Sequence, residues 1–171
     1  DRPPWRVGIS LGDSLSGMFA ALGVMMALYH RDVNGGQGQV VDMALYEAVF
    51  ALLEGSLTEY DKLGYQRSRT GTLLPGFAPS NLYPCRGGQW IVIAANTDGL
   101  FRRLCKLMNR EALLDDPRFA HQVERGQNRE AIDEIVAAWT AEQELPTLLA
   151  QLEAATIPVG PVYSIENIVN D

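Results

Sequence analysis

The chain has 171 residues, 47% hydrophobic and 20% charged, a balance that predicts a folded protein and excludes a disordered one. Its formal net charge of -7 argues against nucleic acid and against anionic membranes as partners, because both require a positive surface. The two cysteines, Cys85 and Cys105, form no CxxC pair, so we expect reduced thiols, a cytoplasmic setting and no metal site.

The start of the sequence gives no expectation of an N-terminal signal peptide. Asp1 to Pro4 is not followed by the apolar region of a signal peptide. The longest apolar stretch, Met18 to Tyr29, is expected to be too short to span a bilayer. Because the chain lacks an initiator Met and a closing signal after Asn170, we expect a piece of a longer protein.

Residues 14–30 predict the first helix. Met18, Leu22, Met25 and Tyr29 recur at helical spacing on one face. Small residues occupy the other side, and a helix that is apolar or small nearly all round is expected to be buried.

The region after this helix predicts further elements. The glycine pair Gly35-Gly36 is a strong helix breaker. Residues 39–43 then predict a short strand, and residues 45–63 predict a second helix that ends near Gly64.

Residues 66–80 lack periodicity and predict a loop. A hairpin is expected next, with strands at 82–85 and 90–94. The turn Arg86-Gly87-Gly88 supplies the glycines that positive φ angles favour.

Three more helices are expected in the last third of the chain. Asn96 or Thr97 is suited to cap a helix over residues 99–108, and residues 128–141 and 145–155 are amphipathic. The result is a mixed α/β chain.

Smaller signals complete this prediction. Thr140 and Gln143 have the spacing of a capping box for the helix that begins near residue 145. Residues 157–162 predict an extended segment, and Ser164 predicts the cap of a last short helix. We place a domain boundary or linker near residues 64–72.

The segment from Gly8 to Met18 is the strongest candidate for chemistry. Asp13 follows Gly12 at the start of the predicted buried helix. It can be read as a helix N-cap, which is the commoner role for such an aspartate. It can also be read as a nucleophile, because a helix N-terminus stabilises the ionised carboxylate.

Several segments together resemble the class III CoA-transferase (CaiB/BaiF) family, which includes formyl-CoA transferase and carnitine CoA-transferase. The resemblance covers nearly the whole chain and keeps the order of the elements. It is carried by Pro4-Trp5-Arg6-Val7-Gly8, Leu11-Gly12-Asp13-Ser14-Leu15-Ser16-Gly17-Met18, Ala27-Leu28-Tyr29-His30-Arg31-Asp32, Gly36-Gln37-Gly38-Gln39-Val40-Val41-Asp42, Ile91-Val92-Ile93-Ala94-Ala95-Asn96, Asp116-Pro117-Arg118-Phe119, Asn128-Arg129 and Ile157-Pro158-Val159-Gly160-Pro161-Val162.

The resemblance implies an α/β fold with a Rossmann-like large domain, a small α+β domain and an interlocked homodimer. Residues 1–66 would then belong to the large domain, 67–163 would form the small domain, and 164–171 would return toward the large domain. The family has acyl-CoA and a carboxylate acceptor as substrates and no permanently bound cofactor. The residues that bind coenzyme A are expected upstream of this chain.

The resemblance also implies that Asp13 matches the family's catalytic aspartate, which attacks the acyl-CoA thioester and passes through anhydride and aspartyl-CoA thioester intermediates. The family's glycine-rich loop corresponds to residues 74–80, which here hold one glycine. Gly76 and Ser80 are candidates for an oxyanion or lid role, although ordinary turn residues are the simpler interpretation. Because this loop holds one glycine instead of several, formyl or oxalate specificity is less expected.

Other charged residues are weaker candidates. Arg67 and Arg69 have the chemistry to bind an acceptor carboxylate through two hydrogen bonds, against the simpler interpretation of a solvated loop. Glu130, Asp133 and Glu134 are predicted to form a solvated helix face.

Two alternatives remain open from the sequence. An acyl-CoA racemase of the same superfamily would pair an aspartate at position 13 with an upstream histidine for α-proton exchange. A noncatalytic dimerisation module would use residues 70–165 only to pack against a partner.

Overall fold

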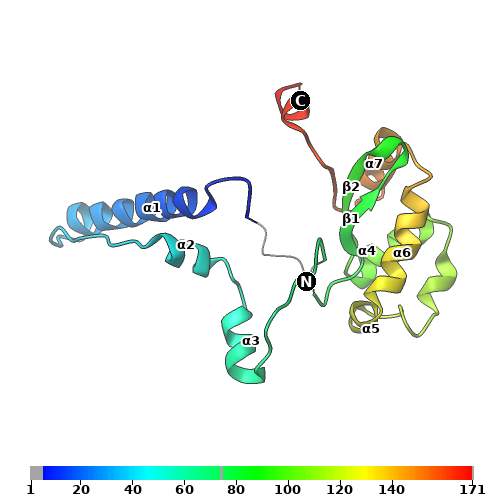
Figure 1. Cartoon of the computed structure of the whole chain (residues 1–171), viewed down its shortest axis with the longest axis horizontal. Helices are drawn as coiled ribbons and strands as arrows, with labels where there is room; N and C mark the ends of the chain where they lie inside the picture. The colour runs from blue at the N-terminus through cyan, green and yellow to red at the C-terminus, as the bar shows by residue number, and fades with distance from the viewer. Residues whose placement is uncertain (1–5, 74, 171) are drawn as a thin grey trace. The chain divides into compact units, whose positions relative to one another are not determined.

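The computed structural model describes residues 6–73 and 75–170 (Figure 1). The chain divides into two compact units, Asp1–Ser68 and Arg69–Asp171. The division lies inside the expected linker at residues 64–72. The assignment of these units to the domains of a whole transferase stays a prediction.

The first unit holds helices α1 (Leu11–Val33), α2 (Leu45–Ala51) and α3 (Ser56–Leu63). The predicted first helix is confirmed and is longer at both ends. The single second helix is wrong, because the chain turns between α2 and α3, where Glu54 has a φ of 52°. Gly64 ends α3 in the left-handed conformation, as its position predicted.

The predicted strand at residues 39–43 is wrong. These residues are not in a strand, since no described segment pairs with them and a strand requires a neighbour. The segment instead passes close to α1. A Cβ added at Gly23 would lie 2.9 Å from a methyl carbon of Val41, so the glycine permits the close approach.

Helix α1 is not buried in this chain, contrary to the prediction. Met18, Leu22 and Met25 are 69%, 57% and 63% exposed, because the described residues offer little surface to cover them. An 18-residue window of α1 has a mean hydropathy of 1.5 and is 6% buried. By length and composition alone α1 can cross a membrane, so the expectation that this stretch is too short is wrong. A core helix of a larger domain passes the same test.

The second unit is built on an antiparallel sheet in the order β1-β2-β3. Its strands are β1 (Ser80–Pro84), β2 (Trp90–Ala94) and β3 (Val159–Pro161). The predicted hairpin is confirmed. Its turn is the 3-10 segment η1 (Arg86–Gly88), whose two glycines have φ angles of 75° and 78°.

The remaining helices of the described residues come after β2 along the chain. They are α4 (Asp98–Leu107), η2 (Glu111–Leu114), α5 (Gln122–Gln127), α6 (Arg129–Thr140), α7 (Leu145–Ala154) and α8 (Ile165–Asn170). The predicted helices of the last third are therefore confirmed, while η2 and α5 were not expected. Thr97 caps α4, because its hydroxyl accepts a hydrogen bond from the Leu100 N–H at 3.3 Å.

The core of the second unit lies on one face of the sheet. Along β2, Ile91 and Ile93 are fully buried, whereas Trp90 and Val92 on the opposite face are 49% and 42% exposed. Helix α6 packs against β1 and α7 against β3 (Figure 1). Phe101, Leu104, Ile132, Val136, Leu148 and Leu152 contribute fully buried side chains from α4, α6 and α7.

The two predicted caps after residue 140 had different outcomes. The capping box is wrong, because Thr140 lies inside α6 and its hydroxyl donates to a carbonyl of the same helix. The N-cap of α7 is Glu144 instead. Ser164 does cap α8, since its hydroxyl accepts from the Asn167 N–H at 3.2 Å.

Candidate active site

Asp13 lies in the first turn of α1. The N-cap of the helix is Ser10, so the interpretation of Asp13 as the N-cap is wrong. Asp13 is the third helical residue and its side chain is exposed. No hydrogen bond or ion pair to its carboxylate occurs among the residues that the structure describes. The group is therefore accessible to a reagent from solvent.

The same turn of α1 is anchored on its other side. The Ser16 hydroxyl donates to the carbonyl of Leu45 at 3.3 Å, and Ser16 is buried. A Cβ added at Gly12 would lie 3.8 Å from that carbonyl and from Val49, so this side faces α2. The anchored turn holds Asp13 in the N-terminal turn of α1, with its side chain exposed.

Arg67 binds a carboxylate of its own unit. Its Nε and Nη2 donate to the two carboxylate oxygens of Glu59 at 2.8 and 2.7 Å, and Glu54 lies 3.6 Å from Nη1. The hydrogen bond from Arg67 lowers the pKa of Glu59. The fork geometry suits an acceptor carboxylate, but such a ligand would have to displace Glu59. Arg69 also has an interaction within the chain.

Gly76 and Ser80 lie in the second unit. Gly76 has a φ of 82°, a conformation that favours glycine, and Ser80 begins β1 opposite Ala94. Leu74, at the start of the loop, is outside the described residues. Asp13 and Arg67 belong to one unit and Arg69, Gly76 and Ser80 to the other. Their convergence on one site stays a prediction.

A buried arginine, Arg125, was not expected from the sequence. It lies on α5 and is fully buried. Its guanidinium donates to the carbonyls of Ala78, Phe119 and Asn96 at 3.2, 3.0 and 2.8 Å, and to a carboxylate oxygen of Asp98 at 2.7 Å. The hydrogen bond from Arg125 lowers the pKa of Asp98. A buried charge needs such partners, and Arg125 has them.

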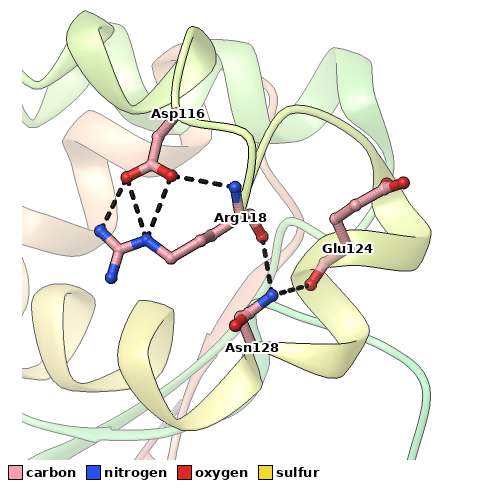
Figure 2. A network of polar contacts seen from close by, with 4 residues as sticks. All are labelled: Asp116, Arg118, Glu124 and Asn128. Carbon is pink, nitrogen blue, oxygen red and sulfur yellow. Dashed lines mark hydrogen bonds and ion pairs between the residues drawn. The ribbon is translucent and has the colours of Figure 1, made fainter.

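The segment before Arg125 is ordered by a polar network (Figure 2). The Asp116 carboxylate accepts hydrogen bonds from the Arg118 backbone N–H and from its guanidinium. The Asn128 side chain donates to the carbonyls of Arg118 and Glu124 at 3.3 and 2.9 Å. This network fixes the turn whose next residue, Phe119, presents its carbonyl to the guanidinium.

Sequence patterns offered no direct signal for Arg125. It stands in a short polar stretch without clear periodicity, where a solvated arginine is the common case. The indirect signal was the resemblance itself. Three of its segments, at 91–96, 116–119 and 128–129, meet around this one guanidinium or support its partners.

The predicted solvated acidic face on α6 is wrong at one position. Glu130 and Glu134 are exposed, but Asp133 is only 9% exposed. The hydroxyl of Tyr83 and the amide of Asn81, the latter at 3.1 Å, donate to its carboxylate. Burial outweighs these hydrogen bonds and raises the pKa of Asp133. Among the described residues, no group of histidines, cysteines and carboxylates could hold a metal ion.

These features agree with the resemblance found in the sequence, and the chain belongs to CoA-transferase family III, whose model matches residues 1–171. It is 45% identical to the succinyl-CoA–D-citramalate CoA-transferase of Chloroflexus aurantiacus, over 100% of this chain and 42% of that protein. It is 30% identical to the succinate–glutarate CoA-transferase of Agrobacterium fabrum, again over 100% and 42%.

Solved structures agree with this family and with the α/β fold class. A CaiB/BaiF family protein from Brucella suis matches with a TM-score of 0.75 and 29% identity, over 100% of this chain and 45% of that chain. A Mycobacterium tuberculosis protein matches with a TM-score of 0.82 and 24% identity, over 99% and 44% of the chains, which shows the fold. The chain thus spans less than half the length of these proteins.

Proposed function

We propose that the whole protein transfers coenzyme A from an acyl-CoA thioester to a carboxylic acid, with Asp13 as the nucleophile. One observation carries the proposal: the Asp13 carboxylate is exposed at the N-terminal turn of α1 without a partner among the described residues. Family membership supplies the reaction class. Because the chain covers 42% of the relatives' length, the activity is assigned to the whole protein.

The first half-reaction loads coenzyme A onto the enzyme. A carboxylate oxygen of Asp13 attacks the thioester carbonyl carbon. The carbon–sulfur bond breaks and the CoA thiolate departs, so that the acyl group and the Asp13 carboxyl group are joined as a mixed anhydride. The thiolate then attacks the aspartyl carbonyl of that anhydride. The donor acid leaves as its carboxylate, and Asp13 carries coenzyme A as a thioester.

The second half-reaction reverses these steps with a new acid. The acceptor carboxylate attacks the aspartyl thioester and expels the thiolate, which gives a second anhydride. The thiolate attacks the acceptor's carbonyl in that anhydride. The new acyl-CoA departs and the Asp13 carboxylate is regenerated, so no proton, metal or redox group is consumed.

The position of Asp13 on α1 suits both roles of its carboxyl group. Asp13 is exposed in the first turn of α1, where a thioester carbonyl can reach its carboxyl group. The first N–H groups of a helix lack partners within the helix. Those of the first turn can donate to the oxyanion of each tetrahedral intermediate, an interaction worth about 3 to 4 kcal/mol in other enzymes.

We base the proposed substrates on the acids for which the relatives are named. Both curated relatives described above are named for C4 or C5 dicarboxylic acids, one with succinyl-CoA as donor. We therefore propose succinyl-CoA as donor and a dicarboxylic or hydroxy dicarboxylic acid as acceptor. An interlocked homodimer and a cytoplasmic location belong to the same proposal.

The test uses the full-length enzyme with succinyl-CoA and a panel of dicarboxylate acceptors. Asp13→Asn should lower kcat by at least about 1,000-fold, since loss of a covalent nucleophile has effects of this size or larger. Asp32→Asn, an exposed aspartate in the last turn of the same helix, is the matched control and should retain activity.

The covalent intermediate gives a second readout. With acyl-CoA alone, mass spectrometry should find coenzyme A attached to Asp13 in the wild type and nothing at residue 13 in Asp13→Asn. An unmodified Asp13 together with acceptor-independent α-proton exchange would replace this proposal with the racemase. If the enzyme turned over no acyl-CoA, the noncatalytic dimerisation module would be the interpretation that remains.

A further inference from the structure

The first turn of α1, which carries Asp13, is fastened to α2 by one buried hydroxyl. Among the described residues of α1, Ser16 is the one that is buried, at 7% exposure. Its hydroxyl donates to the carbonyl of Leu45 at 3.3 Å. A serine inside a helix commonly points to solvent or bonds to the carbonyl one turn earlier in its own helix. This hydroxyl instead joins two helices of one unit.

The geometry of the helix relates Ser16 to the reacting group. Asp13 lies three residues before Ser16, so the two residues are neighbours on the helix surface. Gly12, four residues before Ser16, lies on the side that meets α2, since a Cβ added there would be 3.8 Å from the same Leu45 carbonyl oxygen. Asp13 is exposed whereas Ser16 is buried. The bond therefore fixes this turn from behind while the Asp13 carboxyl group stays open to a substrate.

The acceptor of this bond has a fixed position of its own. Leu45 is the first residue of α2, and the N–H of the preceding Ala44 donates to the Glu47 carboxylate at 3.1 Å. A glutamate at the third helical position that bonds back to the N-cap N–H stabilises the start of a helix. Glu47 thus sets where the Leu45 carbonyl lies, and Ser16 connects α1 to that point.

We propose that Ser16 is a positioning residue of the transferase, whose hydrogen bond to the Leu45 carbonyl holds the first turn of α1, and with it the Asp13 carboxyl group, against α2. The inference rests on the proposed function, and the residues that it uses all lie in the first unit. Its physical content is orientation. Attack on a thioester carbon requires a carboxylate oxygen held at the reacting distance, and misplacement by about 1 Å can cost about 100-fold in rate.

The first test is Ser16→Ala in the full-length enzyme. The substitution removes the hydroxyl and leaves the Asp13 side chain unchanged, and alanine favours a helix at least as well as serine. We expect kcat, and the rate at which the Asp13 adduct forms from succinyl-CoA, to fall by about 10- to 100-fold, while KM stays within about threefold. Thr58→Ala, which removes an exposed hydroxyl from α3 of the same unit, is the matched control and should leave kcat within about twofold.

A second pair of variants tests the same bond from its acceptor side. Glu47→Ala removes the carboxylate that holds the Ala44 N–H and involves no change in α1. It should lower kcat by about 3- to 10-fold, less than Ser16→Ala, because Leu45 remains part of α2. Glu47→Gln keeps a side-chain oxygen that can accept this bond and should restore kcat to within about twofold. The double variant of Ser16→Ala and Glu47→Ala should lose no more than Ser16→Ala alone, since both act through one hydrogen bond.

The outcomes separate this inference from the proposed function. A folded Ser16→Ala enzyme that forms the Asp13 adduct within about twofold of the wild-type rate would overturn the positioning role and leave the transferase reaction intact. A wild-type enzyme that neither transfers coenzyme A nor forms an Asp13 adduct would overturn the proposed function. Slower adduct formation in Ser16→Ala, with KM nearly unchanged, would support both. If Ser16→Ala does not fold, the Glu47 pair decides, and equal kcat values in Glu47→Ala and Glu47→Gln would refute the inference.

Discussion

The two units of this chain differ in how many of their apolar side chains each unit buries within itself. The second unit encloses a continuous core around β1, β2, α4, α6 and α7. In the first unit, the described residues that are buried are Ser16 and Ala48. Apolar side chains on α1 stay open to solvent, although the helix has the composition of a core helix.

This difference teaches where the stability of the chain resides. Burial of apolar surface stabilises by about 25 cal/mol per Å², whereas an isolated helix gains little from its hydrogen bonds alone. The second unit therefore supplies its own driving force for folding. We expect the first unit to depend on surface from the rest of the protein, since the curated relatives are more than twice as long as this chain.

The largest expected effect comes from cutting the chain between the units. Residues 69–171 alone should unfold in one cooperative transition in urea, because the core lies within them. Residues 1–68 alone should show no cooperative transition. Circular dichroism and the dispersion of amide NMR signals measure both, and a sharp transition in the first fragment would break the comparison.

A pair of leucine substitutions sharpens the comparison at single positions. Leu104 on α4 is fully buried and Leu22 on α1 is 57% exposed. In residues 1–171, Leu104→Ala should lower the free energy of unfolding of the second unit by about 2 to 5 kcal/mol, through lost burial and a cavity. Leu22→Ala should change it by no more than about 0.5 kcal/mol.

The whole enzyme provides the complementary measurement for Leu22. If the rest of the protein covers α1, Leu22→Ala should lower thermal stability there by an amount comparable to Leu104→Ala. If Leu22→Ala changed the stability of residues 1–171 and of the whole enzyme equally little, this face of α1 would be exposed to solvent in both.

A smaller effect is expected from pH in the second unit. Burial raises the pKa of Asp133 in the folded state above its unfolded value of about 3.9. The folded state then binds the proton more tightly, so the stabilisation is complete below that value and is lost as pH rises through the raised pKa. Asp98 has the opposite sign, because Arg125 lowers its pKa.

Carboxyl NMR titration of residues 69–171 checks this prediction. Asp133 should titrate at a higher pH than Asp98. In Asp133→Asn, the decline of stability with rising pH that this group causes should disappear. The reverse order of the two titrations would contradict the burial argument.

The sequence predicted the elements that local signals define. Glycine pairs, Thr97 and the helical periodicity of α4, α6 and α7 act over a few residues, and these elements were confirmed. The strand at 39–43 and the burial of α1 were wrong for this chain, because both require a partner surface that the described residues do not supply. A pattern of apolar and polar residues indicates that one face of an element is to be buried, but it does not identify the segment that buries it.

The candidate site shows the same limit. Asp13 could be singled out by its motif and by its place at a helix start. Arg125 could not, since its partners come from segments up to 47 residues away and three of the four are backbone carbonyls, which leave no side-chain pattern. Asp133 was misassigned for the same reason, because its partner Tyr83 is 50 residues distant.

The smallest expected effect separates the two helix caps. Thr97→Ala removes the side-chain bond to the Leu100 N–H and should cost the second unit about 1 kcal/mol. Ser10 makes no such bond, so Ser10→Ala should leave the helix content of residues 1–171 unchanged by circular dichroism.

The outcome at Ser10 bears on the chemistry as well as on folding. A capping serine would accept from the N–H of the second or third helical residue, and the third is Asp13. A silent Ser10→Ala leaves that N–H available to donate to an oxyanion at the reacting carboxyl group. A clear loss of helix content would mean that the Ser10 hydroxyl occupies it, and the donors would then have to come from elsewhere in the enzyme.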